Sequence, residues 1–113
     1  MTKGFYRVEL KCEGKRDWLT LFLPLDGNGA LDLDGEAPPY LFKALWDGED
    51  WAGEFEPGDG GLHGQLVWLG GGTEAGSVYT DLLTAPLCSG GLVSVSANDE
   101  RRMYRVTSLR QVR

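Results

Sequence analysis

Apolar and polar residues alternate along the first part of the chain. From Phe5 to Cys12 every second side chain is apolar, which is typical of a half-buried β-strand. The shared apolar face carries Tyr6, Val8, Leu10 and Cys12. A second strand is predicted from Trp18 to Leu25, where leucine occupies every second position. The polar, glycine-containing residues 13–17 between these strands predict a hairpin.

Turn signals separate further strands. Residues 26–29, with the sequence Asp-Gly-Asn-Gly, predict a tight turn, because glycine and asparagine tolerate a positive φ. Strands are expected after this turn, at Ala30 to Asp34, and again at Leu62 to Leu69. Leu92 to Ala97 and Met103 to Leu109 are expected to form a final hairpin.

Two segments are predicted to be short helices. Tyr40 to Trp46 follows two prolines and precedes Gly48, and proline suits the first turn of a helix as glycine suits its end. Seven residues do not separate the helical period from the strand period, so the alternative is a strand that turns at 47–48 into a second strand at 51–56. We favour the helix. Ser77 to Leu83 is the other predicted helix.

The spacing of strands and turns predicts a mainly β fold, with α+β as the alternative. We expect a small antiparallel meander, either a barrel or a curved sheet, with one or two short helices. A chain of 113 residues has the size of one domain, so residues 1–113 are expected to form a single β-rich domain. The 17 glycines are about twice the usual share and favour short strands with many reversals.

The charge of the chain is concentrated in one region. The net charge is −6, and residues 26–59 hold ten acidic residues against a single cation, Lys43. Such a field repels phosphates and attracts basic surfaces, so we expect no direct nucleic-acid binding. The arginines at 101–105, 110 and 113 are interpreted as pairing within the molecule or as a solvated strand.

Other features exclude several classes of protein. No stretch approaches the roughly 20 apolar residues of a membrane-spanning helix, and the N-terminus lacks the apolar core of a secretory signal. We therefore expect a cytoplasmic protein with no membrane partner. Cys12 and Cys88 have no zinc-site spacing and are expected to be two buried thiols. No metal or cofactor is expected.

Catalytic signals are weak. His63 is the sole histidine, and no serine lies in a G-x-S-x-G turn. Residues 70–75 fit the glycine pattern of a dinucleotide-binding turn, but the antiparallel hairpins before them argue against that fold. No catalytic residue is singled out, and an enzyme using His63 or buried carboxylates is the third hypothesis.

The segment 46–56 is the strongest candidate site because it interleaves carboxylates with aromatic side chains, a combination suited to a protein interface. We expect a non-enzymatic binding module or inhibitor, of a toxin-neutralising or decoy-like kind, that presents this acidic, aromatic face to a basic surface of a partner protein. The predicted contact residues are Trp46, Asp47, Glu49, Asp50, Trp51, Glu54, Phe55 and Glu56.

Two alternatives concern the same residues. The aromatic side chains of the segment could belong to the core, with acidic neighbours that merely face water. A small-ligand or sugar-binding β domain is the second functional hypothesis, in which the four tryptophans line a cleft. These tryptophans are Trp18, Trp46, Trp51 and Trp68. The oligomeric state is left open.

Overall fold

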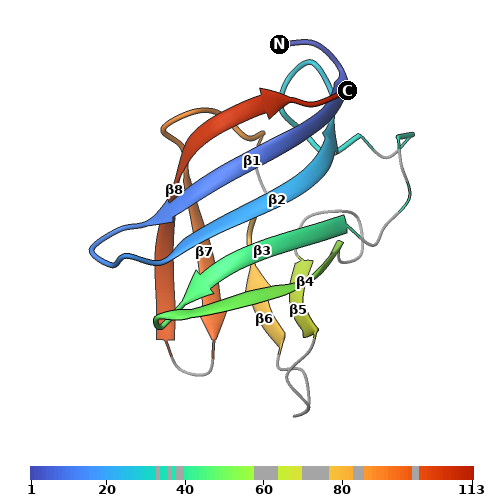
Figure 1. Cartoon of the computed structure of the whole chain (residues 1–113). Helices are drawn as coiled ribbons and strands as arrows, with labels where there is room; N and C mark the ends of the chain where they lie inside the picture. The colour runs from blue at the N-terminus through green and yellow to red at the C-terminus, as the bar shows by residue number, and fades with distance from the viewer. Residues whose placement is uncertain are drawn as a thin grey trace.

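Within the described part of the chain, eight antiparallel strands form a closed barrel (Figure 1). The computed structural model describes residues 1–32, 34–35, 37, 40–57, 64–69, 77–82, 86–97 and 100–113, without the side chains of 68–69, 77–79 and 97. Each strand pairs with its neighbours in sequence, and β1 also pairs with β8. The strands are β1 Gly4–Cys12, β2 Trp18–Leu25, β3 Tyr40–Trp46, β4 Glu49–Pro57, β5 Gly64–Leu69, β6 Ser77–Thr80, β7 Leu92–Ala97 and β8 Glu100–Gln111.

The mainly β prediction and both terminal hairpins are confirmed. β1 and β2 pair in register from Gly4 opposite Leu25 to Lys11 opposite Trp18. β7 and β8 pair in register from Leu92 opposite Arg105 to Ala97 opposite Glu100. No helix among the described ranges is long and apolar enough to cross a membrane.

Inward-facing side chains fill the barrel. Alternation along each strand sends one set of residues inside, and full burial of each large apolar side chain contributes about 1.5–3 kcal/mol relative to its exposure. The largest fully buried side chains are Tyr104, Phe42, Phe55, Leu10, Leu21, Leu23, Leu25, Leu66, Val8, Val95 and Val106. Every strand from β1 to β5, together with β7 and β8, therefore contributes large side chains to the core, and in β6 the described side chain, Thr80, is 5% exposed.

A glycine in β4 makes room for an aromatic ring in this core. Gly53 lies opposite Phe42 in the register, and a Cβ at Gly53 would lie 2.8 Å from the Phe42 ring. The ring therefore covers the bare backbone of β4. Some of the glycine excess thus serves packing inside the barrel as well as turns between strands.

Both predicted helices are wrong. Tyr40–Trp46 is strand β3, because its buried residues alternate with exposed ones and it pairs with β2 and β4. Asp47 and Gly48 adopt φ values of 51° and 82°, which form the tight hairpin turn into β4. Residues 77–80 of the second predicted helix are strand β6, which pairs with β5 and β7.

The predicted turn at 26–29 is present, but the described residues of the strand predicted after it show only a single bridge. The Asp26 carboxylate accepts hydrogen bonds from the backbone N–H groups of Asn28, at 2.8 Å, and Ala30, at 3.1 Å. Beyond the turn, Leu31 makes one isolated bridge with Leu25. Asp26, the first residue of the turn, therefore stabilises it by accepting hydrogen bonds from backbone N–H groups.

The expectation of two buried thiols holds for only one cysteine. Cys12 is buried on the inner face of β1, whereas Cys88 is exposed, and both are free. Cys88 lies between β6 and β7, outside the alternating strand pattern that buries Cys12.

Candidate functional site

The candidate segment 46–56 forms parts of β3 and β4, and its aromatic side chains face inward. Phe55 is fully buried, with 0% of its surface exposed, so it cannot contact a partner as predicted. Trp46 and Trp51 pack against the core and are partly buried. These aromatic residues therefore belong to the core or pack against it, because every second side chain of a barrel strand points inward.

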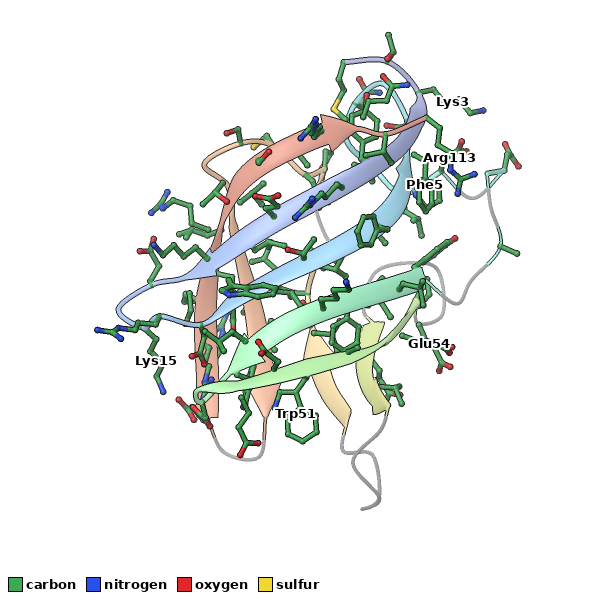
Figure 2. The ribbon with its side chains drawn as sticks, in the orientation of Figure 1. Lys3, Phe5, Lys15, Trp51, Glu54 and Arg113 are labelled. Atoms are coloured by element: carbon green, nitrogen blue, oxygen red, sulfur yellow. The ribbon has the colours of Figure 1, made fainter. Side chains whose placement is uncertain are left out.

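The carboxylates of β4 face outward. Asp50 and Glu56 are exposed and Glu54 is half-buried, and all three lie on the outer face because they alternate with inward Gly53 and Phe55. We call Asp50, Glu54 and Glu56 the acidic row. Figure 2 shows Glu54 and Trp51 at separate positions along this strand.

Exposed apolar residues of β3 lie beside the acidic row. Leu41 stands directly opposite Glu54 and is 63% exposed, which makes it the most exposed of the large apolar side chains described. Leu45 stands opposite Asp50 and is half-buried. Lys43, between these leucines, is exposed and stands opposite Ala52.

The two acidic residues at the β3–β4 turn are separate from this row. The Asp47 carboxylate lies 2.8 Å from Arg102 Nη2 and 3.9 Å from Lys15 Nζ, so it forms ion pairs within the molecule. Glu49 is exposed and stands opposite Trp46 at the start of β4. The predicted site residues thus divide among the core, the turn and the outer face.

A buried arginine joins three parts of the barrel. The Arg102 side chain in β8 is 4% exposed, and its Nη1 donates to Asp17 Oδ2 at 2.6 Å. Its other nitrogens donate to Asp47 at 2.8 Å and to Glu100 at 3.1 Å. Its guanidinium lies 3.8 Å from the centre of the Trp46 ring. We call these five residues the arginine cluster.

The electrostatics of the arginine cluster favour the charged forms of Arg102 and Glu100. Burial opposes the charge of Arg102, but hydrogen bonds to Glu100 and Asp47 outweigh it and hold the arginine pKa above its usual range. Hydrogen bonds from Arg102 and from Lys15 lower the pKa of Glu100. Because Arg102 already contacts three carboxylates and a ring, the cluster is suited to holding the barrel together.

Two titratable side chains beside the cluster are kept neutral. Burial raises the pKa of the Cys12 thiol and raises that of the Tyr104 hydroxyl well above its usual range. A reactive cysteine needs a lowered pKa, so Cys12 does not have the environment of a nucleophile. No group of three or more metal-ligating side chains occurs within the described part of the chain.

Sequence reasoning anticipated part of this cluster. Pairing of the C-terminal arginines within the molecule is confirmed for Arg102, and also for Arg105, whose Nε lies 2.8 Å from Glu13. It missed Asp17, which is 85 positions from Arg102. No local signal in the sequence connects those two positions, because they meet only where the barrel closes.

The tryptophans described in full do not line one cleft. Trp18 is on the outer face of β2, opposite Lys11, and is 37% exposed, whereas Trp46 and Trp51 pack against the core from β3 and β4. The side chain of Trp68 is outside the described part of the structure. His63 and residues 70–75 also lie outside the described residues.

The observed architecture is an up-and-down antiparallel β-barrel in which each strand follows its neighbour in sequence. Comparisons with protein-family models, with curated proteins and with solved structures found no match.

Proposed function

We propose that this chain is a non-enzymatic binding protein that presents the outer face of β3 and β4 to a basic protein surface. The observation that carries the proposal is the highly exposed Leu41 beside the acidic row. We call Leu41, Leu45 and the acidic row together the acidic face. An inhibitor or decoy that occupies a basic site on its target is the form of binding that this chemistry suits best.

The charge of the acidic face favours a basic partner. The acidic row supplies three carboxylates, and Lys43 is the only cation on β3 and β4, so the outer face of the two strands has a net charge of 1 − 3 = −2. No ion pair within the described residues engages the acidic row, whereas Asp47 and Glu100 have cationic partners. These carboxylates are therefore available to steer and orient a cationic surface.

The exposed leucine supplies the apolar part of the contact. Leu41 has 63% of its surface in water, and burying it against a partner is worth roughly 1–2 kcal/mol at the usual value for a leucine side chain. Carboxylates at the rim of an interface mainly raise the association rate. We therefore expect loss of the carboxylates to slow association and loss of the leucine to speed dissociation.

The test begins with capture of a partner from a lysate of the source organism at low salt, followed by purification of that partner. The natural chain is compared with a variant carrying Asp50→Asn, Glu54→Gln and Glu56→Gln. The matched control carries Glu9→Gln, Glu13→Gln and Asp34→Asn, three changes that alter the net charge equally but lie outside the acidic face.

The proposal expects the purified partner to bind the natural chain and the control with similar association rates, and the acidic-row variant about ten-fold more slowly at low salt. A Leu41→Ala variant should dissociate faster. Equal association by the acidic-row variant and the control would contradict the proposal, and so would an association rate that does not change with salt.

A further inference from the structure

The face that β8, β1 and β2 present to solvent is hollowed and basic. Two adjoining grooves of about 470 Å³ and 340 Å³ share Lys11 and Thr107 in their linings. The side chains that give them their character are Arg7, Lys11, Lys15, Arg16, Trp18 and Arg105, which we call the basic groove. Figure 2 shows Lys15 at the β1–β2 turn, and this residue lines one of the two grooves.

The basic groove contains more cations than the described carboxylates of the molecule pair with. The two linings hold five cations and two carboxylates, Glu9 and Glu13, in a chain of net charge −6. Those carboxylates pair with Arg7 and Arg105, and Lys15 pairs with Asp47 and Glu100 outside the linings. Among the ion pairs of the described residues, none includes Lys11 or Arg16.

The strand register places like charges directly opposite one another. Lys11 stands opposite Arg105, and Arg7 stands opposite Arg110, across the β1–β8 pair. Such cross-strand pairs destabilise a sheet, so the fold gains nothing from them. Ion pairs of Arg7 with Glu9 and of Arg105 with Glu13 offset part of this repulsion, and a ligand with negative charges between the strands would relieve more of it.

An exposed aromatic ring borders these cations. Trp18 is 37% exposed and stands directly opposite Lys11 on the outer face. Close by, β8 has a bulge at Thr107, whose hydroxyl donates to the backbone carbonyl of Glu9 at 3.1 Å. Bulges of this kind redirect side chains and are frequent beside binding sites.

The acidic face does not cancel this field. β1 and β4 are separated by three strand spacings, or roughly 14 Å along the sheet, which exceeds the screening length of about 8 Å at physiological salt. The expectation of no direct nucleic-acid binding rested on the acidic residues 26–59, and the basic groove lies outside that segment.

We propose that the basic groove binds a short single-stranded segment of nucleic acid, with phosphates at Lys11, Arg16 and Arg105 and a base stacked on Trp18. Cations that follow a backbone, together with an aromatic ring that accepts any base, form the usual site for single strands. A duplex keeps its bases stacked on one another and cannot use the indole ring. An acidic peptide would use the cations but would not require stacking on Trp18.

The test is a fluorescence titration of the natural chain with oligothymidylate and oligouridylate of about eight nucleotides, at about 50 mM salt. Parallel titrations use a duplex of the same length, a mononucleotide, heparin and polyglutamate. The variants are Trp18→Ala, Trp18→Phe and the pair Lys11→Glu with Arg16→Glu, each checked for a native circular dichroism spectrum. Arg101→Glu is the control for charge reversal as such, because it reverses one charge, half the change of the double variant, on an exposed residue of β8 outside the groove.

The single strands should quench tryptophan emission, bind more tightly than the duplex or the mononucleotide, and lose affinity as salt rises. Trp18→Ala should weaken binding at least five-fold and remove most of the quenching, with Trp18→Phe in between. The double charge reversal should abolish binding, whereas Arg101→Glu and the acidic-row variant should bind normally. Because the acidic-row variant should still bind nucleic acid, failure of this inference can be distinguished from failure of the proposed function.

Three outcomes would overturn the inference. The first is no binding of either single strand by the natural chain. The second is binding to heparin, polyglutamate and single strands alike that Trp18→Ala leaves unchanged, which would define a nonspecific anion surface. The third is tighter binding of the duplex than of the single strands.

Discussion

Replacing the buried Arg102 with methionine should cost this barrel a large part of its stability. Methionine preserves much of the side-chain volume but removes the positive charge from the arginine cluster. The Asp17 side chain, only 6% exposed, would then keep a negative charge in the protein interior without its cation. It would retain the hydrogen bond from the backbone N–H of Asp47, at 3.1 Å.

The expected size follows from that burial. Removing one partner of a buried ion pair costs about 3–5 kcal/mol, because the remaining charge is uncompensated. The same change in an exposed pair costs less than about 1 kcal/mol. Arg105→Met supplies the control, since Arg105 is on the same strand and pairs with Glu13, but both side chains are 49% exposed. A domain of this size is stable by only about 5–15 kcal/mol, so the two variants should differ clearly.

Urea unfolding followed by circular dichroism measures the difference. With a slope of about 1.5 kcal/mol per molar urea, Arg102→Met should lower the midpoint by roughly 2–3 M, and Arg105→Met by well under 1 M. Adding Asp17→Leu to Arg102→Met should recover part of the loss, because no buried charge then remains. If Arg102→Met and Arg105→Met lower stability equally, or if Asp17→Leu adds a further full loss, the role assigned to this pair is wrong.

Two further predictions concern titration and thiol chemistry. Hydrogen bonds from Arg102 and Lys15 lower the folded-state pKa of Glu100. The stability that Glu100 contributes is therefore present above its unfolded pKa of about 4.5 and is lost as pH falls through the folded pKa. Glu100→Gln should accordingly make stability fall less steeply with decreasing pH, and parallel curves of stability against pH for the two proteins would contradict this. In native protein a thiol reagent should modify Cys88 rapidly and Cys12 only on unfolding, because Cys12 is buried and its pKa is raised. Cys88→Ser should remove the rapid phase, and two rapidly reacting thiols would show that Cys12 is accessible.

The strands with one clearly apolar face were predictable from the sequence. Trp18–Leu25 was predicted with the observed bounds, because its leucines alternate without interruption. Tyr40–Trp46 was delimited correctly but assigned to a helix, because Leu41 and Leu45 place apolar residues on the outer face and hide the period of two. Pairing on both sides, which sequence alone does not show, determines that this segment is a strand.

The candidate site was predictable only in part. Alternation along β4 places Phe55 in the core and Glu54 and Glu56 on the outer face. This division follows only if the segment is a strand, and the sequence analysis favoured a helix at 40–46 over the hairpin that contains β4. The basic groove depends on the register between β1 and β8, which brings Lys11 beside Arg105 across more than ninety positions of chain. Contacts between the first and last strands carry no local sequence signal.

The pairing of β1 with β8 also sets an order of events during synthesis. Every other strand partner is a neighbour in sequence and can be met soon after it is made, whereas β1 must wait for the last strand of the barrel. Until then β1 is an open sheet edge, and open edges are sites where chains aggregate. The arrival of β8 covers that edge and delivers Arg102 to Asp17 and Asp47, so one late step both closes the ring and neutralises its buried carboxylate.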